Sequence, residues 1–214
     1  MLIDTHMHEK TYSGDSHQAL EEIVKTARER GLDAVCITDH ESNRLWDEAH
    51  RYAKENGFPI FVGTEILTKE GDLVVFGLTD LPEEMLHAQD LIRLVDQAGG
   101  VCISAHPYRT NNRGLGNHLR DVEGLAGVEA FNGNTPPHHN LMAYAVATEL
   151  GLPMFGASDA HWAHQVGKYA TIFPDGIRDE QDLIAAIRSK EVRPAVYYEG
   201  EYISIDLAQQ LHRP

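Results

Sequence analysis

The sequence has few cysteines and no long apolar run. Its 214 residues include only two cysteines, Cys36 and Cys102, and both lie inside short apolar stretches. Neither has the paired spacing of a zinc–thiolate site, so we interpret both as buried, reduced thiols, with a disulfide between them as the alternative. No apolar run approaches the roughly 18 residues that cross a bilayer, and the start of the chain lacks the pattern of a secretory signal. These absences predict a cytoplasmic protein without membrane contact.

Positive charge is also scarce. Eighteen Lys and Arg residues stand against 33 Asp and Glu residues, which gives a formal net charge of −15. Binding the phosphate backbone of a long nucleic acid needs many basic side chains on one face, so such a partner is not expected. A small anionic substrate remains compatible with this charge, because bound metal ions could meet its charge locally.

Short apolar runs alternate with amphipathic stretches along the whole chain. Helical spacing of apolar residues predicts five helices, at 17–30, 43–56, 82–98, 138–150 and 179–190. Strands are predicted at 2–6, 33–40, 58–65, 101–107, 127–132, 152–161, 168–173 and 193–198, with a hairpin over 67–78 that turns at 70–72. Strands that precede helices number about seven, which favours a mostly parallel α/β barrel over an open sheet. We expect one domain spanning residues 1–214.

Polar side chains of one chemical kind follow nearly every predicted strand. These strand ends carry His6 and His8, Asp39 and His40, Glu65, His106, Glu129 and Asn132, and Asp159 and His161. In a barrel of alternating strands and helices the carboxyl ends of the strands meet at one mouth. Imidazole and carboxylate groups in one concavity are typical of a metal site, and more than four ligands indicate two or three ions. Five other histidines are predicted to lie outside this site: His17, His50, His87, His118 and His212. Three more could reach the barrel mouth, although surface positions are favoured for them: His138, His139 and His164.

The ordered motifs DTHMH, TDH, GTE, AHP and SDAH resemble the polymerase and histidinol phosphatase (PHP) family of metal-dependent phosphoesterases. The resemblance runs from residue 2 to about residue 170. It implies a single-domain, distorted seven-stranded (βα)7 TIM-like barrel that holds up to three divalent ions and hydrolyses phosphate esters. Zinc, manganese and iron all suit such ligands.

The resemblance also implies a ligand set for each ion. One ion is expected on His6, His8, Glu65 and Asp159; a second on Glu65 and His106; and a third on Asp15, His40 and His161. Asp4 and Asp39 are expected to orient the imidazoles. Many members carry a further histidine on the strand after the glutamate motif, where this chain has Val74 or a neighbour. The second ion is therefore expected to be completed by water, Asn132 or Glu129, or to be absent.

These residues suggest hydrolysis of a small phosphate monoester, such as a nucleotide or a metabolite like histidinol phosphate. A hydroxide bridging the ions would attack phosphorus, with Asp159, His161 and His106 as the catalytic residues. The last two are candidates for protonating the leaving oxygen. Arg109 and Arg113 follow His106 and are expected to contact the phosphate.

Three other functions remain open from the sequence. The same metals could serve a phosphodiesterase or an exonuclease acting on short oligonucleotides. A metal amidohydrolase is a further enzyme reading, although no lysine stands out as a bridging ligand and Glu65 fills that role. A non-catalytic metal-binding module is the alternative outside enzymology. The sequence predicts no particular oligomeric state.

Overall fold

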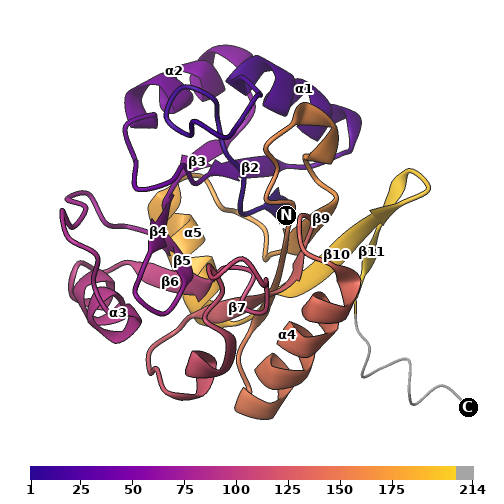
Figure 1. Ribbon diagram of the computed structural model, residues 1–214. Helices are drawn as coiled ribbons and strands as arrows, with labels where there is room; N and C mark the ends of the chain where they lie inside the picture. The colour runs from indigo at the N-terminus through magenta and orange to yellow at the C-terminus, as the bar shows by residue number, and fades with distance from the viewer. Residues whose placement is uncertain (206–214) are drawn as a thin grey trace, which may run out of the picture.

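The computed structural model describes residues 1–205 of the chain (Figure 1). The described part contains five α-helices: α1 (Leu20–Glu29), α2 (Trp46–Asn56), α3 (Ala88–Gln97), α4 (Pro137–Leu150) and α5 (Glu180–Ser189). Its strands are β1 (Leu2–Asp4), β2 (Ala34–Ile37), β3 (Ile60–Val62), β4 (Thr64–Leu67), β5 (Asp72–Phe76), β6 (Val101–Ser104), β7 (Gly127–Asn132), β8 (Met154–Ala157), β9 (Tyr169–Ile172), β10 (Arg193–Tyr198) and β11 (Glu201–Ser204). His212 lies outside the described residues.

All five predicted helices form, four within three residues of their expected bounds and α3 beginning six residues later than expected. In α1 the residues Leu20, Ile23, Val24 and Ala27 are buried, which is the spacing of one helix face. The start of α5 is fixed by Asp179, whose side chain accepts a hydrogen bond from the backbone N–H of Asp182 at 2.9 Å. The predicted hairpin also forms, with β4 and β5 paired antiparallel.

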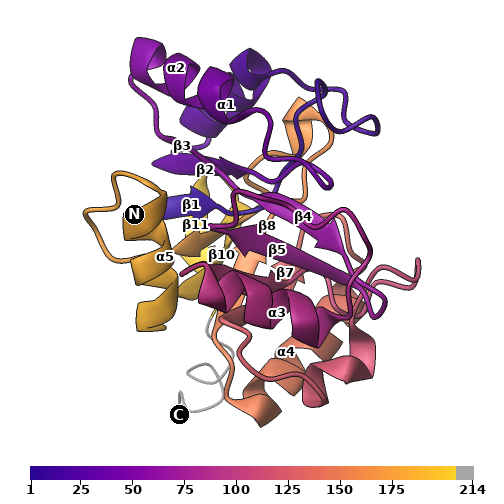
Figure 2. The same cartoon turned by 90° about the vertical axis from the view of Figure 1, so that its left-hand side faces the viewer.

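The strands form two sheets. The first has six strands in the order β11-β10-β9-β1-β2-β3, and the second has five in the order β4-β5-β6-β7-β8. Parallel pairs join β1, β2 and β3, and also β6, β7 and β8, whereas β9, β10, β11, β4 and β5 pair antiparallel. Figure 2 shows α1 and α2 covering the strands on one side, with α3 and α4 on the opposite side.

The predicted seven-stranded (βα)7 TIM-like barrel is therefore wrong, because the described strands form two mixed sheets and do not close into one ring. The alternation of strands and helices was visible in the sequence, but the pairing partners were not. The strand β9 runs antiparallel beside β1 and occupies the edge that a closing parallel strand would need. The two sheets also separate between β3 and β4. After Gly63 the chain passes into the second sheet, where β4 pairs antiparallel with β5.

The two sheets meet at two junctions. At the first, Gly63 joins β3 to β4, and a Cβ there would lie 2.6 Å from the carbonyl oxygen of Val75, so only glycine fits. Beside it His40 and Glu65 form an isolated parallel bridge. At the second, Met7 and Ala160 form another isolated bridge just beyond the ends of β1 and β8. The junctions thus bring polar strand ends together without closing a barrel.

A threonine hydroxyl links β8 to β9 where no backbone ladder does. The Oγ1 atom of Thr171 accepts from the N–H of Gly156 at 3.0 Å and donates to its carbonyl oxygen at 2.9 Å. Gly156 lies so close to β9 that a Cβ on it would be 2.5 Å from the carbonyl oxygen of Ala170. The hydroxyl therefore satisfies two backbone groups that the break between the sheets would leave unpaired.

Replacing Thr171 with valine is expected to lower the free energy of unfolding by about 1–3 kcal/mol. Valine keeps the shape of the side chain but leaves the buried N–H and C=O of Gly156 without partners. Urea unfolding of both proteins measures the difference. The matched control is Thr148→Val on the exposed face of α4, where the hydroxyl bonds only the carbonyl of Tyr144. Equal stability of the two variants would contradict this role for Thr171.

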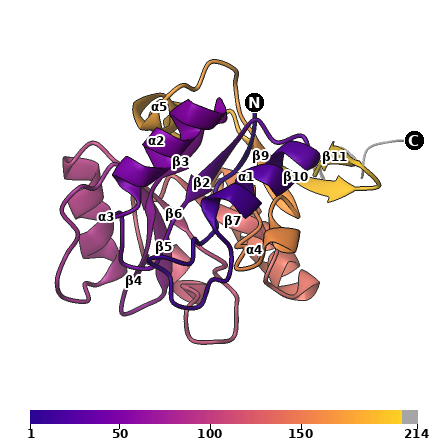
Figure 3. The ribbon, with the colours of Figure 1, turned by 90° about the horizontal axis from the view of Figure 1, so that it is seen from above.

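The β10–β11 hairpin extends from the body of the molecule (Figure 3). Its two-residue turn has left-handed φ angles at both Glu199 (50°) and Gly200 (93°), as a tight hairpin turn requires. The sequence reading ended with β10 and missed β11. Among the described residues, no helix is long and apolar enough to cross a membrane.

Candidate metal centre

Four buried side chains converge between the ends of β1 and β8 and the start of β4. The Nε2 atoms of His6 and His8 lie 3.1 Å apart. Glu65 Oε2 lies 3.4 Å from each of these nitrogens. Asp159 Oδ1 lies 3.6 Å from the Nε2 of His6 and 3.3 Å from that of His8. All four side chains are at most 1% exposed, so their donor atoms face one another rather than solvent.

The spacing of these donors fits a small divalent ion. Ligands about 2.05 Å from an ion at the corners of a tetrahedron are roughly 3.3 Å apart. The five measured separations, from 3.1 to 3.6 Å, scatter around that value. Two imidazoles and two carboxylates are also the donor types that such ions take. The residues present therefore fit a metal ion at this position.

Two of the site residues have left-handed backbone conformations. The φ angle is 52° at Asp159 and 31° at His106, both of which follow the end of a strand. Such angles are unusual for residues other than glycine and concentrate at functional sites. The N–H of Asp159 donates to the carbonyl of His6 at 2.8 Å, which fixes the aspartate beside the paired histidines.

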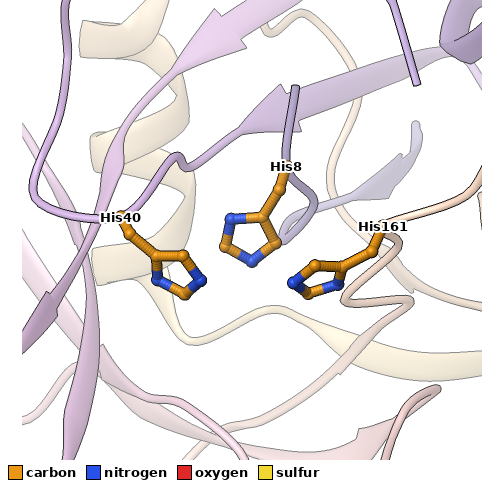
Figure 4. A group of neighbouring side chains, drawn as sticks. All are labelled: His8, His40 and His161. Carbon is orange, nitrogen blue, oxygen red and sulfur yellow. The ribbon is translucent and has the colours of Figure 1, made fainter. Parts of the chain in front are cut away.

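A second group of donors lies nearer the surface. Figure 4 shows the imidazoles of His8, His40 and His161 converging from three separate segments of the chain. The ring centroid of His8 is 4.3 Å from that of His40 and 4.4 Å from that of His161. Asp15 Oδ2 lies 3.1 Å from the Nε2 of His40 and 3.2 Å from that of His161. Asp15 is 55% exposed, so this group borders solvent.

Glu65 connects these donors to a third group. Its Oε2 lies 3.0 Å from His40 Nδ1, and its Oε1 lies 2.8 Å from His106 Nε2. Asp72 Oδ2 lies 3.7 Å from the same nitrogen of His106. The structure thus brings all eight predicted ligand residues into one continuous cluster and adds Asp72, which the sequence reading missed.

The charges in the cluster are strongly coupled. Burial alone would lower the pKa of His6, but the carboxylates of Glu129 and Glu65 raise it well above its usual value. Burial lowers the pKa of His8 to about 4, which keeps its ring neutral and able to bind a cation. Although burial acts to raise it, the pKa of Glu65 lies well below its usual range because His6 and His106 stabilise its charge. Protons on imidazoles thus balance the carboxylates when no ion does so.

Metal binding is therefore expected to release protons at neutral pH. Burial lowers the pKa of His40, but its bond to Glu65 and the charges of Glu65 and Asp15 raise it to about 9. The ring is protonated in the folded protein below pH 9, and an ion must displace that proton. Calorimetry at pH 7.5 in two buffers of different ionisation heat should show release of about one proton or more per chain. An imidazole with an ordinary pKa of about 6.5 would release only about 0.1 proton at that pH, and such a result would contradict the raised pKa.

The side chains behind the cluster hold the imidazoles in place. Glu129 Oε1 lies 2.7 Å from His6 Nδ1, and its Oε2 accepts from the N–H of His106 at 3.0 Å. Glu129 therefore lies behind His6 rather than in the second ion position. The sequence offered it as a strand-end carboxylate, but not with this role.

Asp39 is linked to an imidazole through a hydroxyl group, whereas Asp4 bonds backbone groups. Asp39 Oδ1 accepts from the hydroxyl of Ser13 at 3.0 Å, and that hydroxyl lies 3.3 Å from His8 Nδ1, so Asp39 acts on the imidazole through Ser13. Asp4 accepts from the backbone N–H groups of Ser158 and Gly167, at 2.9 and 2.8 Å. The expectation that Asp4 orients an imidazole is wrong, because its side chain ties β1 to the segment after β8.

Glu129→Gln is expected to weaken metal binding by about 10–100-fold while preserving the fold, because an orienting carboxylate behind a metal-binding imidazole is lost. Competition with a chelator of known affinity measures the change. Glu55→Gln, at an exposed position near the end of α2, is the matched control. Unchanged affinity in Glu129→Gln would show that Glu129 has no such role.

The two arginines expected to contact phosphate both line an opening of about 270 Å³ above the cluster. Arg109 donates to Asn132 Oδ1 at 2.7 Å and also bonds the carboxylate of Asp159. Arg113 Nε donates to Asp72 Oδ2 at 2.6 Å, and its side chain is one-third exposed. Arg109 thus orients Asp159, whereas Arg113 faces the opening more freely. Among the described histidines, only His40, His106 and His161 line this opening.

Buried imidazoles and carboxylates on two mixed sheets thus form a candidate metal centre. Comparisons with known proteins give the family. A family model described as PHP-associated matches residues 137–192. The uncharacterized protein MJ1587 of Methanocaldococcus jannaschii is 34% identical over 142 residues, which cover 62% of this chain and 82% of that protein. A "Probable phosphatase" of Caldicellulosiruptor bescii is 30% identical over 123 residues, 53% of this chain, and the chain spans about half (48%) of its length.

Two solved structures share the fold. A proposed metal-dependent phosphoesterase of Bifidobacterium adolescentis has a TM-score of 0.65 and 18% identity over 97% of this chain and 98% of that chain. The lesion-specific endonuclease EndoQ of Pyrococcus furiosus has a TM-score of 0.68 and 17% identity over 88% of this chain and 56% of that chain. The chain belongs to the PHP family.

Proposed function

We propose that the protein is a phosphomonoesterase for a small phosphorylated metabolite and that its cluster holds two or three divalent ions. The observation that carries the proposal is the convergence of four buried side chains. The imidazole nitrogens of His6 and His8 lie 3.1 Å apart, and carboxylate oxygens of Glu65 and Asp159 lie 3.3–3.6 Å from these nitrogens. Another ion position is supported by Asp15, whose Oδ2 lies 3.1 Å from His40 Nε2 and 3.2 Å from His161 Nε2. Zinc, manganese and iron all suit these ligands.

Bound divalent ions would supply a water molecule acidified to near neutrality and would neutralise the phosphoryl oxygens. In the overall reaction a bond forms between the water oxygen and phosphorus, the bond from phosphorus to the ester oxygen breaks, and the leaving alcohol takes a proton. His161 is better placed than His106 to provide that proton. Its side chain is 15% exposed beside the opening, whereas that of His106 is only 2% exposed. Asp159 and His106 would act by holding ions.

Arg113 would help to bind the phosphate. Its guanidinium lines the opening, and a planar guanidinium suits bidentate contact with phosphate oxygens. Arg109 is committed to Asp159 and Asn132, so we assign it mainly to positioning the aspartate. This narrows the expectation that both arginines touch the substrate.

A small substrate is favoured by size and by charge. The opening of about 270 Å³ is at the small end of the range of ligand pockets. The net charge of −15 opposes binding of a long nucleic acid. The structural likeness to EndoQ keeps nuclease chemistry on a short or terminal substrate as the second candidate.

The test measures which class of substrate the manganese-loaded enzyme hydrolyses. Nucleoside monophosphates, histidinol phosphate, sugar phosphates and short 5′-labelled oligonucleotides are offered separately, and both free phosphate and oligonucleotide length are measured. We expect phosphate release from at least one monoester, with the oligonucleotides left intact. Shortened oligonucleotides without phosphate release from any monoester would replace this proposal with a nuclease. No product from any substrate would favour a non-catalytic module.

A further inference from the structure

Asp72 is a fully buried carboxylate whose nearest site neighbours are Glu65 and His106. Its Oδ2 lies 3.7 Å from His106 Nε2, and that nitrogen lies 2.8 Å from Glu65 Oε1. Its Oδ1 has no hydrogen-bond partner among the described residues, although the side chain is 0% exposed. A buried carboxylate with an unused oxygen is costly unless a cation or a donor compensates it.

The position of Asp72 on β5 explains how it reaches the cluster. Glu65 on β4 pairs directly with Val74 on β5, so these two side chains share a face of the hairpin. Asp72 is two residues before Val74 and therefore points to the same face. Val74 itself packs in the apolar core and brings no donor. Asp72 thus supplies, two residues earlier, a donor that this face lacks at Val74.

We propose that Asp72 completes the second ion position expected on Glu65 and His106, and that Arg113 takes the place of the ion at Asp72 when the position is empty. This inference rests on the metal cluster of the proposed function. With two carboxylates and one imidazole, the position has harder donors than the pair of histidines at His6 and His8. Such a set favours manganese or magnesium over zinc.

Arg113 has the contacts expected of a stand-in cation. Its Nε lies 2.6 Å from Asp72 Oδ2, and one terminal nitrogen lies 3.4 Å from His40 Nδ1. The side chain comes from the loop that follows His106 and is 33% exposed, so it can leave without unfolding a core. An ion arriving at Asp72 competes with the guanidinium. The displaced guanidinium remains at the opening, where it can meet a phosphate.

The experiment counts ions in the full-length protein. Metal-stripped wild type, Asp72→Asn and Asp72→His are equilibrated with manganese or zinc at the same free concentrations, and bound metal is measured by mass spectrometry. Asp72→Asn should lower the affinity for one manganese ion by at least about 100-fold and leave the binding of the other ions unchanged. Asp72→His should recover that ion with zinc preferred over manganese.

Arg113→Gln separates a ligand role from a structural one. It removes the same ion pair as Asp72→Asn but keeps the carboxylate, so it should bind the additional ion more tightly than wild type does. Loss of the ion in both variants would mean that the ion pair merely holds the loop, and the inference would be overturned. Unchanged binding in Asp72→Asn would overturn it as well.

The ion count and the catalytic assay test the two proposals separately. If wild type holds an ion that depends on Asp72 but releases no phosphate, the phosphomonoesterase proposal is contradicted and the ion position is supported. If phosphate is released and no ion depends on Asp72, only the proposed ion position is contradicted.

Discussion

Asp159→Asn should lower phosphate release by roughly 10³-fold or more. Asp159 Oδ1 lies within 3.6 Å of the Nε2 atoms of both His6 and His8, so its charge completes the most buried donor set. Asparagine has nearly the same shape but no charge. It still offers an oxygen to Arg109, so the loss should reflect the metal position more than a collapse of the site. Steady-state phosphate release with manganese-loaded protein measures the effect.

Bound metal must be measured in the same Asp159→Asn preparation. We expect one ion fewer per chain than in wild type. The control is Asp80→Asn, an exposed aspartate in the segment between β5 and α3, which should behave as wild type. An Asp159→Asn protein with full activity and full metal content would remove Asp159 from the site.

Glu65→Gln should have the largest effect on the cluster as a whole. The glutamate lies 2.8 Å from His106 Nε2 and 3.0 Å from His40 Nδ1, and it also contacts His6 and His8. Its loss should remove more than one ion and abolish phosphate release. The metal-free protein should also lose about 3–5 kcal/mol of unfolding free energy at neutral pH, because buried imidazolium charges lose their partner.

Metal analysis and urea unfolding of stripped Glu65→Gln test these two expectations separately. Glu55→Gln at an exposed position serves as the control for both. A Glu65→Gln protein that holds as many ions as wild type would contradict the bridging role of Glu65. Equal stability of the stripped proteins would contradict the charge balance inferred from the raised pKa of His40.

The local elements, and the residues that converge in the cluster, were predictable from sequence because each leaves a short-range signal. Helix periodicity marked α1 to α5, and polar residues at strand ends marked His6, His8, His106 and Asp159. These side chains meet because strand ends gather at the junctions of the two sheets, and that does not require a closed barrel. The predicted residues therefore cluster in the structure even though the predicted barrel was wrong.

The global pairing was not predictable in the same way. Nothing in the run from 168 to 173 indicates that β9 lies antiparallel beside β1. The contact of Gly156 with β9 and the two bonds of the Thr171 hydroxyl become visible only when both strands are placed. Such tertiary contacts override the alternation of strands and helices that suggested a barrel.

Two side chains of the cluster were missed or misassigned for a related reason. The sequence places Asp72 in a predicted Glu-Gly-Asp turn, where a carboxylate is ordinarily exposed, but in the structure it begins β5. Its burial follows from the pairing of β4 with β5 and from Arg113 above it. Arg109 looked like a free phosphate ligand, but its contacts with Asp159 and Asn132 show that it also orients the cluster.

The central claim, that this cluster hydrolyses phosphate esters through bound metal, is tested most directly by titrating stripped enzyme with manganese while phosphate release is followed. The substrate is the best monoester from the panel, and Asp159→Asn is carried alongside. The account predicts no release from stripped wild type, a rise in rate that follows the number of ions bound, and almost no recovery in the variant. Full activity of the stripped enzyme, or no activity at full metal occupancy, would contradict it.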